Sequence, residues 1–304
     1  MVSLVPPRCA VNIEYFAPPA RLRRYFSAFF LIEVTVAGEA MVEDCYVPEW
    51  ATLRFFSGTQ FEGEDRQGSK LSGTTFPVTG HHTQEILFRV GTVRLWTLNL
   101  SPLGWARLVG EPADRYANAK IDGNQHPAFA RFRPLAASLF DMHRNPQQEL
   151  DRIVACLDEM AIEPRATDQR IEDIFVALLD PQLTSVRVLA DRVGLTQRTL
   201  ERTCLEVFGF SPKLLLRRQR FMRSLTDFLL DPSLKWIGAM DALYHDQAQF
   251  VRDFRQFMGM TPSEYAARDK PIMDLVIRKR EQYTRDIVRH VRQQGDMRDF
   301  GLRD

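Results

Sequence analysis

Arginine and glutamine side chains at the start of a short helix are the residues of this chain best suited to a specific chemistry. The segment 196–208 begins at Thr196, whose hydroxyl is a good N-cap, and Leu200, Cys204 and Val207 then recur at helical spacing and face the core. The residues left for contact with a ligand are Thr196, Gln197, Arg198, Glu201 and Arg202. Arginine is the usual bidentate partner of guanine, and glutamine can pair in the same way with adenine. The pattern therefore predicts hydrogen bonds to duplex DNA.

A second set of the same kind lies in segment 246–258. Asp246 is a good N-cap there, and Phe250, Phe254 and Phe257 occupy the inward positions. The residues predicted to contact DNA from this segment are Asp246, Gln247, Gln249 and Arg252.

Both sets belong to one thirteen-residue pattern that occurs twice, fifty positions apart. The first copy reads Leu200-x-Arg202-x-Cys204-x-x-Val207-Phe208-Gly209-Phe210-Ser211-Pro212, and the second reads Phe250-x-Arg252-x-Phe254-x-x-Phe257-Met258-Gly259-Met260-Thr261-Pro262. In each copy a glycine suits the left-handed residue that ends a helix, and a hydroxyl–proline pair opens the next helix. A repeated helix–turn unit indicates one surface that is used twice.

Each of the two predicted reading helices needs a shorter helix and a turn before it. Segment 185–191 with Gly194, and segment 236–243 with the turn at 243–245, supply these parts and complete two helix-turn-helix units. Segment 211–230 then joins the units as one long helix. A stiff connector fixes the spacing of the reading helices, and two major-groove contacts on one face of DNA lie about 34 Å apart. Arginines along this connector are Arg217, Arg218, Arg220 and Arg223.

Residues from about 181 to 268 resemble the DNA-binding domain of the AraC/XylS family of bacterial transcription factors. The matching residues are Leu189-Ala190, Gly194-Leu195-Thr196, Leu200-x-Arg202, Gly209-x-Ser211-Pro212, Phe250-x-Arg252-x-Phe254 and Gly259-x-Thr261-Pro262. The N-terminal part is similar to the cupin-like domain that often precedes it, through Tyr15-Phe16-x-Pro18-Pro19 and the segment 100–104. The resemblance implies a sensor or dimerisation domain that controls promoter binding and the recruitment of RNA polymerase.

The second unit departs from the family pattern at two positions. Leu243 stands where the family has a turn glycine, and Gly238 stands where an aliphatic core residue is expected. A left-handed non-glycine residue and a glycine inside a helix each cost about 1 kcal/mol. We therefore expect the first unit to be the main element of specificity.

The elements before these units predict an α+β protein. An N-terminal antiparallel β-barrel, cupin-like domain precedes an all-α domain of two helix-turn-helix units joined by a long helix. The β-branched and aromatic runs that predict strands are 29–36, 52–56, 85–90 and 92–100, with short helical insertions at 21–30 and 103–109. The expected domains are a sensor or dimerisation domain at 1–128, a helical connector at 129–180, the DNA-binding domain at 181–270, and an amphipathic helix and tail at 271–304.

Two amphipathic regions have more than one interpretation. Helices at 129–142 and 148–161 carry an apolar stripe that suits packing onto the chain's own β domain and homodimerisation equally well. In the helix expected at 271–294, the basic face is either solvated or contacts phosphate or a partner.

The β half contains few residues with catalytic potential. His81, His82 and Glu85 form one tight cluster, but neighbouring strand residues point to opposite faces, so we expect a polar loop and no metal site. The sequence contains no phosphate-loop or nucleophile motif. We therefore expect that the protein is not an enzyme and binds no cofactor. The interior of the barrel has two interpretations, a binding site for a small-molecule effector and an ordinary filled core. Its expected lining is Phe29, Phe55, Phe88 and Trp96.

Composition agrees with a cytoplasmic regulator. The sequence has no signal layout and no apolar run of the roughly 18 residues that cross a membrane, and its four scattered cysteines suit a reducing compartment. Residues 181–304 carry 22 Lys+Arg against 16 Asp+Glu, a charge of +6, and the rest of the chain carries −5. This asymmetry favours a DNA-binding C-terminal half. The alternatives are a small-molecule-binding or enzymatic β-barrel with a vestigial helical domain, and a protein-interaction adaptor.

Overall fold

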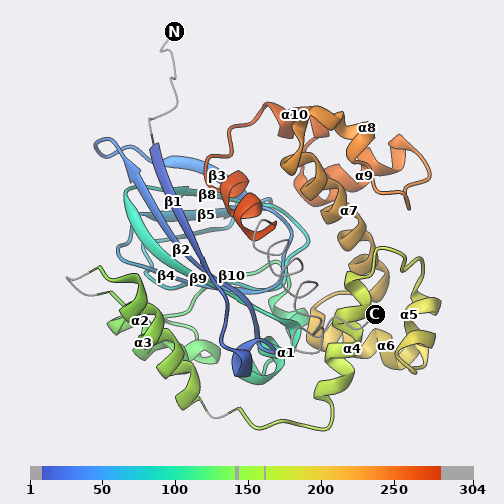
Figure 1. Ribbon diagram of the computed structural model, residues 1–304, viewed down its shortest axis with the longest axis horizontal. Coiled ribbons are helices and arrows are strands. Elements are labelled where there is room, and N and C mark those ends of the chain that lie inside the picture. Colours follow the sequence, from blue (N-terminus) through green and yellow to red (C-terminus); the bar gives the residue numbers. More distant parts are fainter. Residues whose placement is uncertain (1–8, 141–143, 161, 282–304) are drawn as a thin grey trace, which may run out of the picture.

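The computed structural model describes residues 9–140, 144–160 and 162–281. A β domain comes first in the chain and a set of helices follows (Figure 1). Two groups of these helices lie at opposite ends of the long helix α7 (Pro212–Leu230), beside the β domain. In the described part of the chain, we find no helix that combines the length and apolarity needed to cross a membrane.

The larger of two antiparallel sheets has six strands in the order β1-β2-β9-β4-β7-β10. Its strands are β1 (Cys9–Phe16), β2 (Phe26–Val36), β4 (Thr52–Phe56), β7 (Pro77–Thr79), β9 (Val93–Leu100) and β10 (Lys120–Asp122). Long antiparallel pairing between β2 and β9, with Leu31 opposite Trp96, forms its centre. Of these strands, β2, β4 and β9 coincide with β-branched and aromatic runs predicted from the sequence, whereas β1, β7 and β10 were not predicted.

The smaller sheet has four strands in the order β3-β8-β5-β6. They are β3 (Val42–Tyr46), β5 (Phe61–Asp65), β6 (Lys70–Ser72) and β8 (Ile86–Val90). Within the described residues the two sheets share no strand pair. The expected antiparallel, cupin-like β domain is therefore confirmed, but its two sheets form an open pair and do not close into a barrel. Edges that are left unpaired in this way can be covered by other elements of the chain.

Alternation along β2 divides the β domain between two hydrophobic cores. Phe29 and Leu31 face one core, and Phe30, Ile32 and Val34 face the other. The first core continues into the first helix-turn-helix unit through Leu200. Because Phe254 of the second unit belongs to the other core, each unit shares a hydrophobic core with the β domain.

The connection after β9 is helical. Its elements are α1 (Pro102–Gly104), the π-helical turn η2 (Trp105–Val109), the 3₁₀ turns η3 (Ala113–Tyr116) and η4 (Pro127–Phe132), and the helices α2 (Arg133–Ser138) and α3 (Pro146–Glu159). The helix expected at 103–109 is thus present. At 21–30 only the 3₁₀ turn η1 (Ala20–Leu22) forms, because Phe26 already begins β2.

Helix α3 packs onto its own β domain through the apolar stripe seen in the sequence. Ile153 and Leu157 are buried in the first core. The buried Glu149 accepts hydrogen bonds from Arg94 Nη2 at 2.8 Å and from Trp96 Nε1 at 2.7 Å. Of the two interpretations of this stripe, packing within the chain is the one that the structure supports.

The remaining helices are those of the two predicted helix-turn-helix units together with one helix that precedes them. They are α4 (Asp168–Leu179), α5 (Val186–Arg192), α6 (Gln197–Thr203), the π-helical turn η5 (Cys204–Phe208), α7, the 3₁₀ turn η6 (Pro232–Leu234), α8 (Lys235–Ala239), α9 (Gln247–Met258) and α10 (Pro262–Ala267). Residues 273–281 form a further helix beside the smaller sheet, drawn in red in Figure 1. The rest of the C-terminal helix expected from the sequence lies outside the described residues.

Candidate nucleic-acid interface and effector cavity

The first helix-turn-helix unit has the caps that the sequence predicts. Ser185 caps α5 by accepting a hydrogen bond from Val188 N at 3.2 Å. Thr196 caps α6 by accepting one from Thr199 N, also at 3.2 Å. Gly194 between the helices has φ +64°, a left-handed turn conformation that glycine adopts without strain.

The outward face of α6 is free for a ligand. Leu200 is fully buried, whereas the residues predicted to contact DNA are exposed. Those residues are Thr196, Gln197, Arg198, Glu201 and Arg202. Neither arginine among them forms an ion pair with any part of the chain that the structure describes. Two solvated guanidinium groups directly behind a helix N-terminus can donate hydrogen bonds to base edges or phosphate oxygens.

The second unit presents a similar face on α9. Asp246 caps this helix, accepting a hydrogen bond from Gln249 N at 2.6 Å, and Gly259 ends it with φ +66°. Gln247 and Arg252 are exposed. Gln249 is half-buried, and its side-chain oxygen accepts a hydrogen bond from the His245 backbone N–H at 3.2 Å, so this glutamine already has a local partner.

The turn of the second unit differs from the expectation of strain at Leu243. Leu243 has no left-handed φ. The Asp241 side chain accepts a hydrogen bond from Leu243 N at 2.9 Å, and the Asp241 carbonyl accepts one from Tyr244 N at 3.0 Å. This hydrogen-bonded turn replaces the glycine turn, so the predicted cost there was wrong. The helix predicted at 236–243 is also shorter, since α8 ends at Ala239, and the exposed Gly238 lies near its end.

Arginines of α7 hold the second helix-turn-helix unit in place. Asp253 on α9 is buried, and its carboxylate accepts hydrogen bonds from Arg217 at 2.5 Å, from Arg220 at 3.2 Å and from Tyr244 Oη at 3.2 Å. Arg223 pairs in the same way with Asp241 at 2.5 Å. Sequence analysis singled out these arginines but missed the two aspartates. Asp253 carries one sequence signal, an acidic residue within an otherwise apolar helix face, whereas Asp241 lies in the turn after α8.

The remaining arginine of α7, Arg218, is buried between this helix and the β domain. Its guanidinium lies 3.7 Å from the centre of the Trp50 ring and donates to the backbone oxygens of Glu49 and His82 at 3.4 Å. Burial lowers the pKa of Arg218 to about 9. Arg218 therefore fixes α7 against the β domain and does not face DNA.

His81 and His82 lie in a loop, as expected, but they are buried instead of solvated. His81 Nδ1 accepts a hydrogen bond from Ala51 N at 2.9 Å, and His82 Nδ1 lies 2.9 Å from the Gln84 carbonyl. Burial lowers the pKa of both imidazoles, that of His82 to about 3. Among the described residues no group of His, Cys, Asp or Glu could hold a metal ion.

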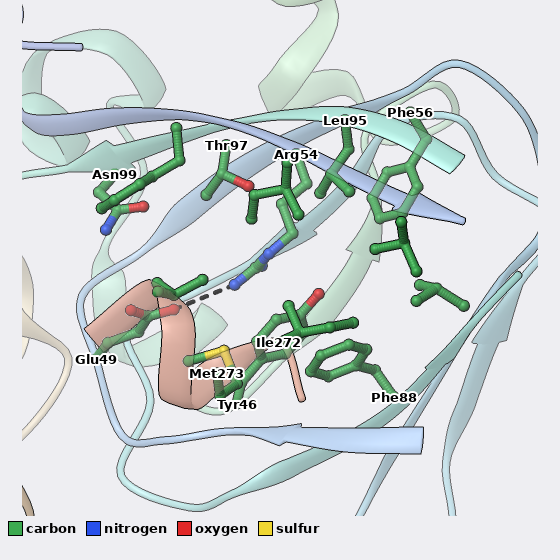
Figure 2. A pocket seen from close by; sticks show the side chains of 15 residues that line it. Tyr46, Glu49, Arg54, Phe56, Phe88, Leu95, Thr97, Asn99, Ile272 and Met273 are labelled. Atoms are coloured by element: carbon green, nitrogen blue, oxygen red, sulfur yellow. Dashed lines mark hydrogen bonds and ion pairs between the residues drawn. The ribbon is translucent and has the colours of Figure 1, made fainter. Parts of the chain in front are cut away.

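An apolar cavity lies between the two sheets (Figure 2). Its volume of about 30 Å³ leaves space for roughly two water molecules. The lining residues are Phe30, Ile32, Val34, Tyr46, Glu49, Arg54, Phe56, Phe88, Val90, Leu95, Thr97, Asn99, Ile272, Met273 and Val276. Of the lining predicted from the sequence only Phe88 is correct. Phe29, Phe55 and Trp96 face the other core, because a shift by one residue along a strand moves a side chain to the opposite face.

A second hollow lies near η2 and η4 and has a mixed polar and apolar lining. It has a volume of about 470 Å³ and includes Glu111, Tyr116, His126 and Arg131 in its lining. Arg131 donates hydrogen bonds to backbone oxygens of the chain, including that of Met160 at 3.1 Å. Its guanidinium is therefore already engaged, and this hollow is the weaker candidate for a ligand site.

The two capped, outward-facing helices define a helix-turn-helix DNA-binding protein. Residues 189–268 match a family model described as a helix-turn-helix domain. This segment is an AraC/XylS-type domain, and the protein is a DNA-binding transcription regulator. A comparison with curated proteins gives no match.

Several solved structures are similar to the chain. ToxT from Vibrio cholerae is 9% identical with a TM-score of 0.42, covering 84% of this chain and 97% of ToxT. A structure of ToxT with bound unsaturated fatty acid is 10% identical with a TM-score of 0.41, covering 84% of this chain and 94% of ToxT. The AraC-like transcriptional activator CuxR is 11% identical with a TM-score of 0.26, covering 70% of this chain and 86% of CuxR.

Proposed function

We propose that this regulator reads two segments of the DNA major groove, with α6 as the main element of specificity and α9 as the second. The observation that carries the proposal is the pair of exposed arginines on α6, Arg198 and Arg202, behind the Thr196 cap, neither of which forms an ion pair with the described residues. The contact residues proposed are Thr196, Gln197, Arg198, Glu201, Arg202, Asp246, Gln247, Gln249 and Arg252.

Helix α7, which joins the two helix-turn-helix units, supports a fixed spacing of α6 and α9. Its 19 residues rise by about 28 Å, close to one turn of DNA. Ion pairs from Arg217 and Arg220 to Asp253 tie α9 to this rod. We assign the DNA-binding domain to residues 181–270, behind a sensor domain at 1–128 and a helical connector at 129–180, with a C-terminal helix and tail at 271–304.

Selection of bound duplexes from a random library tests the proposal. Full-length protein should enrich one sequence, and its affinity should fall steeply as salt rises, because phosphate contacts release counterions. Arg202→Ala should cost about 1–3 kcal/mol of binding and relax one base position, if that arginine reads a base. Arg89→Ala, at an exposed arginine of β8, is the matched control and should leave binding unchanged.

Two results would contradict this function. An unchanged affinity and sequence preference for Arg202→Ala would remove that residue from the interface. A library without any enriched sequence, together with binding that salt does not weaken, would favour a ligand-binding or enzymatic β domain with a vestigial helical domain, or an adaptor that binds protein partners.

We also propose that a small-molecule effector modulates DNA binding from the cavity between the sheets. Both cores of the β domain extend into the helix-turn-helix units, which supports coupling between an occupant and the reading helices. Recruitment of RNA polymerase in the cytoplasm completes the proposed activity.

Homodimerisation is a separate proposal. The exposed apolar side chains Val176 and Leu179 of α4, at 48% and 47% exposure, support a partner surface. Light scattering across a concentration series should reveal a dimer, which Val176→Asp should weaken. A monomer at every concentration would contradict it.

A further inference from the structure

Two polar atoms in the cavity lack partners. Thr97 Oγ1 and Asn99 Oδ1 are buried, and neither makes a hydrogen bond within the described part of the chain. Thr97 is 8% exposed. Both residues belong to β9 and line the cavity that Figure 2 shows. A buried oxygen without a partner carries a desolvation penalty. The Asn99 amide oxygen can only accept, and the Thr97 hydroxyl can accept as well as donate, so together they favour a ligand that brings a hydrogen-bond donor.

The charged groups at this end of the cavity already satisfy one another. Arg54 donates to Glu49 Oε1 at 3.1 Å and to Thr79 Oγ1 at 2.9 Å, and its guanidinium lies 3.8 Å from the centre of the Tyr46 ring. A ligand carboxylate would meet Glu49 without a free cation, and a ligand ammonium would meet Arg54 without a free anion. Either ion would therefore be desolvated without adequate compensation.

The C-terminal segment supplies the apolar side chains that now fill the remaining space. Ile272 and Met273 are each 4% exposed and lie below the Arg54 side chain and beside Tyr46 in Figure 2. The Asp44 carboxylate of β3 accepts hydrogen bonds from the backbone N–H groups of Ile272 and Met273, both at 2.9 Å. This segment is held against the cavity by these hydrogen bonds and by burial of Ile272, Met273 and Ile277 in the second core.

From these observations we propose that the cavity binds a small apolar molecule with a neutral, hydrogen-bond-donating end, such as an alcohol or a primary amide. The donor bonds Thr97 and Asn99, and the apolar body takes the place of Ile272 and Met273. The proposal rests on the effector function proposed above and specifies its ligand class and its competitor.

Displacement of the segment has a direct route to the second helix-turn-helix unit. Only a few residues separate Ile272 from α10, and Lys270 donates a hydrogen bond to the Tyr265 backbone oxygen of α10 at 2.9 Å. On the other side, Arg278 donates to the Leu230 backbone oxygen at the end of α7 at 3.3 Å. A ligand that releases residues 270–278 thus loosens contacts of the unit that contains α9.

Titration calorimetry of the full-length protein with four molecules of matched length tests the ligand class. Octanol and octanamide should bind, and octanoate and octylamine should bind at least about tenfold more weakly because their charges find no partner. Thr97→Val keeps the shape of the side chain and should lower octanol affinity about fivefold. Thr35→Val, at an exposed threonine of β2, should leave octanol affinity unchanged. Tightest binding of either charged molecule, or no binding of octanol and octanamide, would overturn the proposal.

Removal of the competing side chain tests the displacement. Met273→Ala should raise octanol affinity about tenfold, since the binding-competent state is then populated more often. Leu275→Ala, at an exposed residue of the same helix, is the control and should have no effect. Equal octanol affinities of the wild-type protein and Met273→Ala would refute displacement.

Hydrogen exchange gives an independent measurement that does not depend on a variant folding. Octanol should accelerate exchange of the Ile272 and Met273 amides, which Asp44 protects in the free protein. Slower or unchanged exchange with octanol bound would contradict displacement. DNA binding is measured separately on the selected duplex. Ligand binding without any selected duplex would refute the proposed regulator but leave this inference standing, whereas DNA binding without octanol binding would refute the inference alone.

Discussion

Removal of the Asp253 carboxylate should loosen α9 and weaken DNA binding by the second unit. Asp253 is 2% exposed, and it is the shared partner of Arg217 and Arg220 on the connector. Breaking a buried ion pair by removing one partner costs about 3–5 kcal/mol. Here the arginine side chains are 32% and 15% exposed, so water can solvate part of their released charge. We therefore expect Asp253→Ala to cost about 2 kcal/mol.

Native-state hydrogen exchange measures this change at the site itself. A loss of about 2 kcal/mol corresponds to roughly thirtyfold faster exchange, provided that exchange follows opening of the second unit. The acceleration should appear at α9 amides and be much smaller at α6. Asp253→Asn should have a smaller effect, because the amide oxygen can still accept the Tyr244 hydroxyl hydrogen bond.

The matched control is Asp269→Ala, at an exposed acid that lies just after α10. It should leave α9 exchange and affinity for the selected duplex unchanged, while Asp253→Ala lowers that affinity by misplacing Arg252. Identical α9 exchange in the two variants would show that the carboxylate does not hold this helix, and would refute the reasoning.

Three further predictions concern the β domain and its contact with the helices. Glu149→Gln removes the buried charge that pairs with the Arg94 guanidinium and the Trp96 indole, and should lower the free energy of urea unfolding by about 2–4 kcal/mol. Glu159→Gln, at an exposed position, should leave that free energy unchanged. Equal urea midpoints for the two variants would contradict this prediction. Gly209 has φ +78°, and a Cβ there would lie 3.1 Å from the Ala113 backbone oxygen. Gly209→Ala should therefore lower the free energy of unfolding by about 1–2 kcal/mol, whereas Gly58→Ala, with open space around it, should leave it unchanged. Burial lowers the pKa of His82 to about 3, and the unfolded chain therefore binds more protons below pH of about 6.5. The contribution of His82 to stability should fall as the pH falls from about 7 to about 5, and His82→Gln should remove that contribution; parallel melting-temperature profiles of the wild-type protein and the variant would contradict this.

Local patterns in the sequence predicted the DNA-binding region well. Thr196 and Asp246 cap the helices expected of them, and Gly209 and Gly259 adopt the left-handed conformation at the helix ends. These features depend on residues within one or two turns of each other, so the sequence contains the information needed to recognise them. The prediction of a strained turn at Leu243 was wrong, because the Asp241 side chain accepts a hydrogen bond from Leu243 N and the turn does not need a glycine.

Longer-range features could not be predicted with the same success. Phe29 and Phe30 are neighbouring aromatic residues that enter different cores, and the direction of each depends on the strand register. Asp253 and Arg217 are separated by 36 positions, and their pairing depends on how α9 packs against α7. A sequence pattern carries no direct signal for such a pair.

The sequence by itself determined that two helix-turn-helix units stand in tandem and which of their side chains face away from the core. Periodicity and capping are short-range properties of the chain, and they suffice for that conclusion. Only the tertiary structure decided what the β domain does with those units. It opened the expected barrel into two sheets, gave each unit a core in common with them, and brought Ile272 and Met273 into the cavity. Those contacts join segments far apart in sequence, so they exist only once the whole chain has packed.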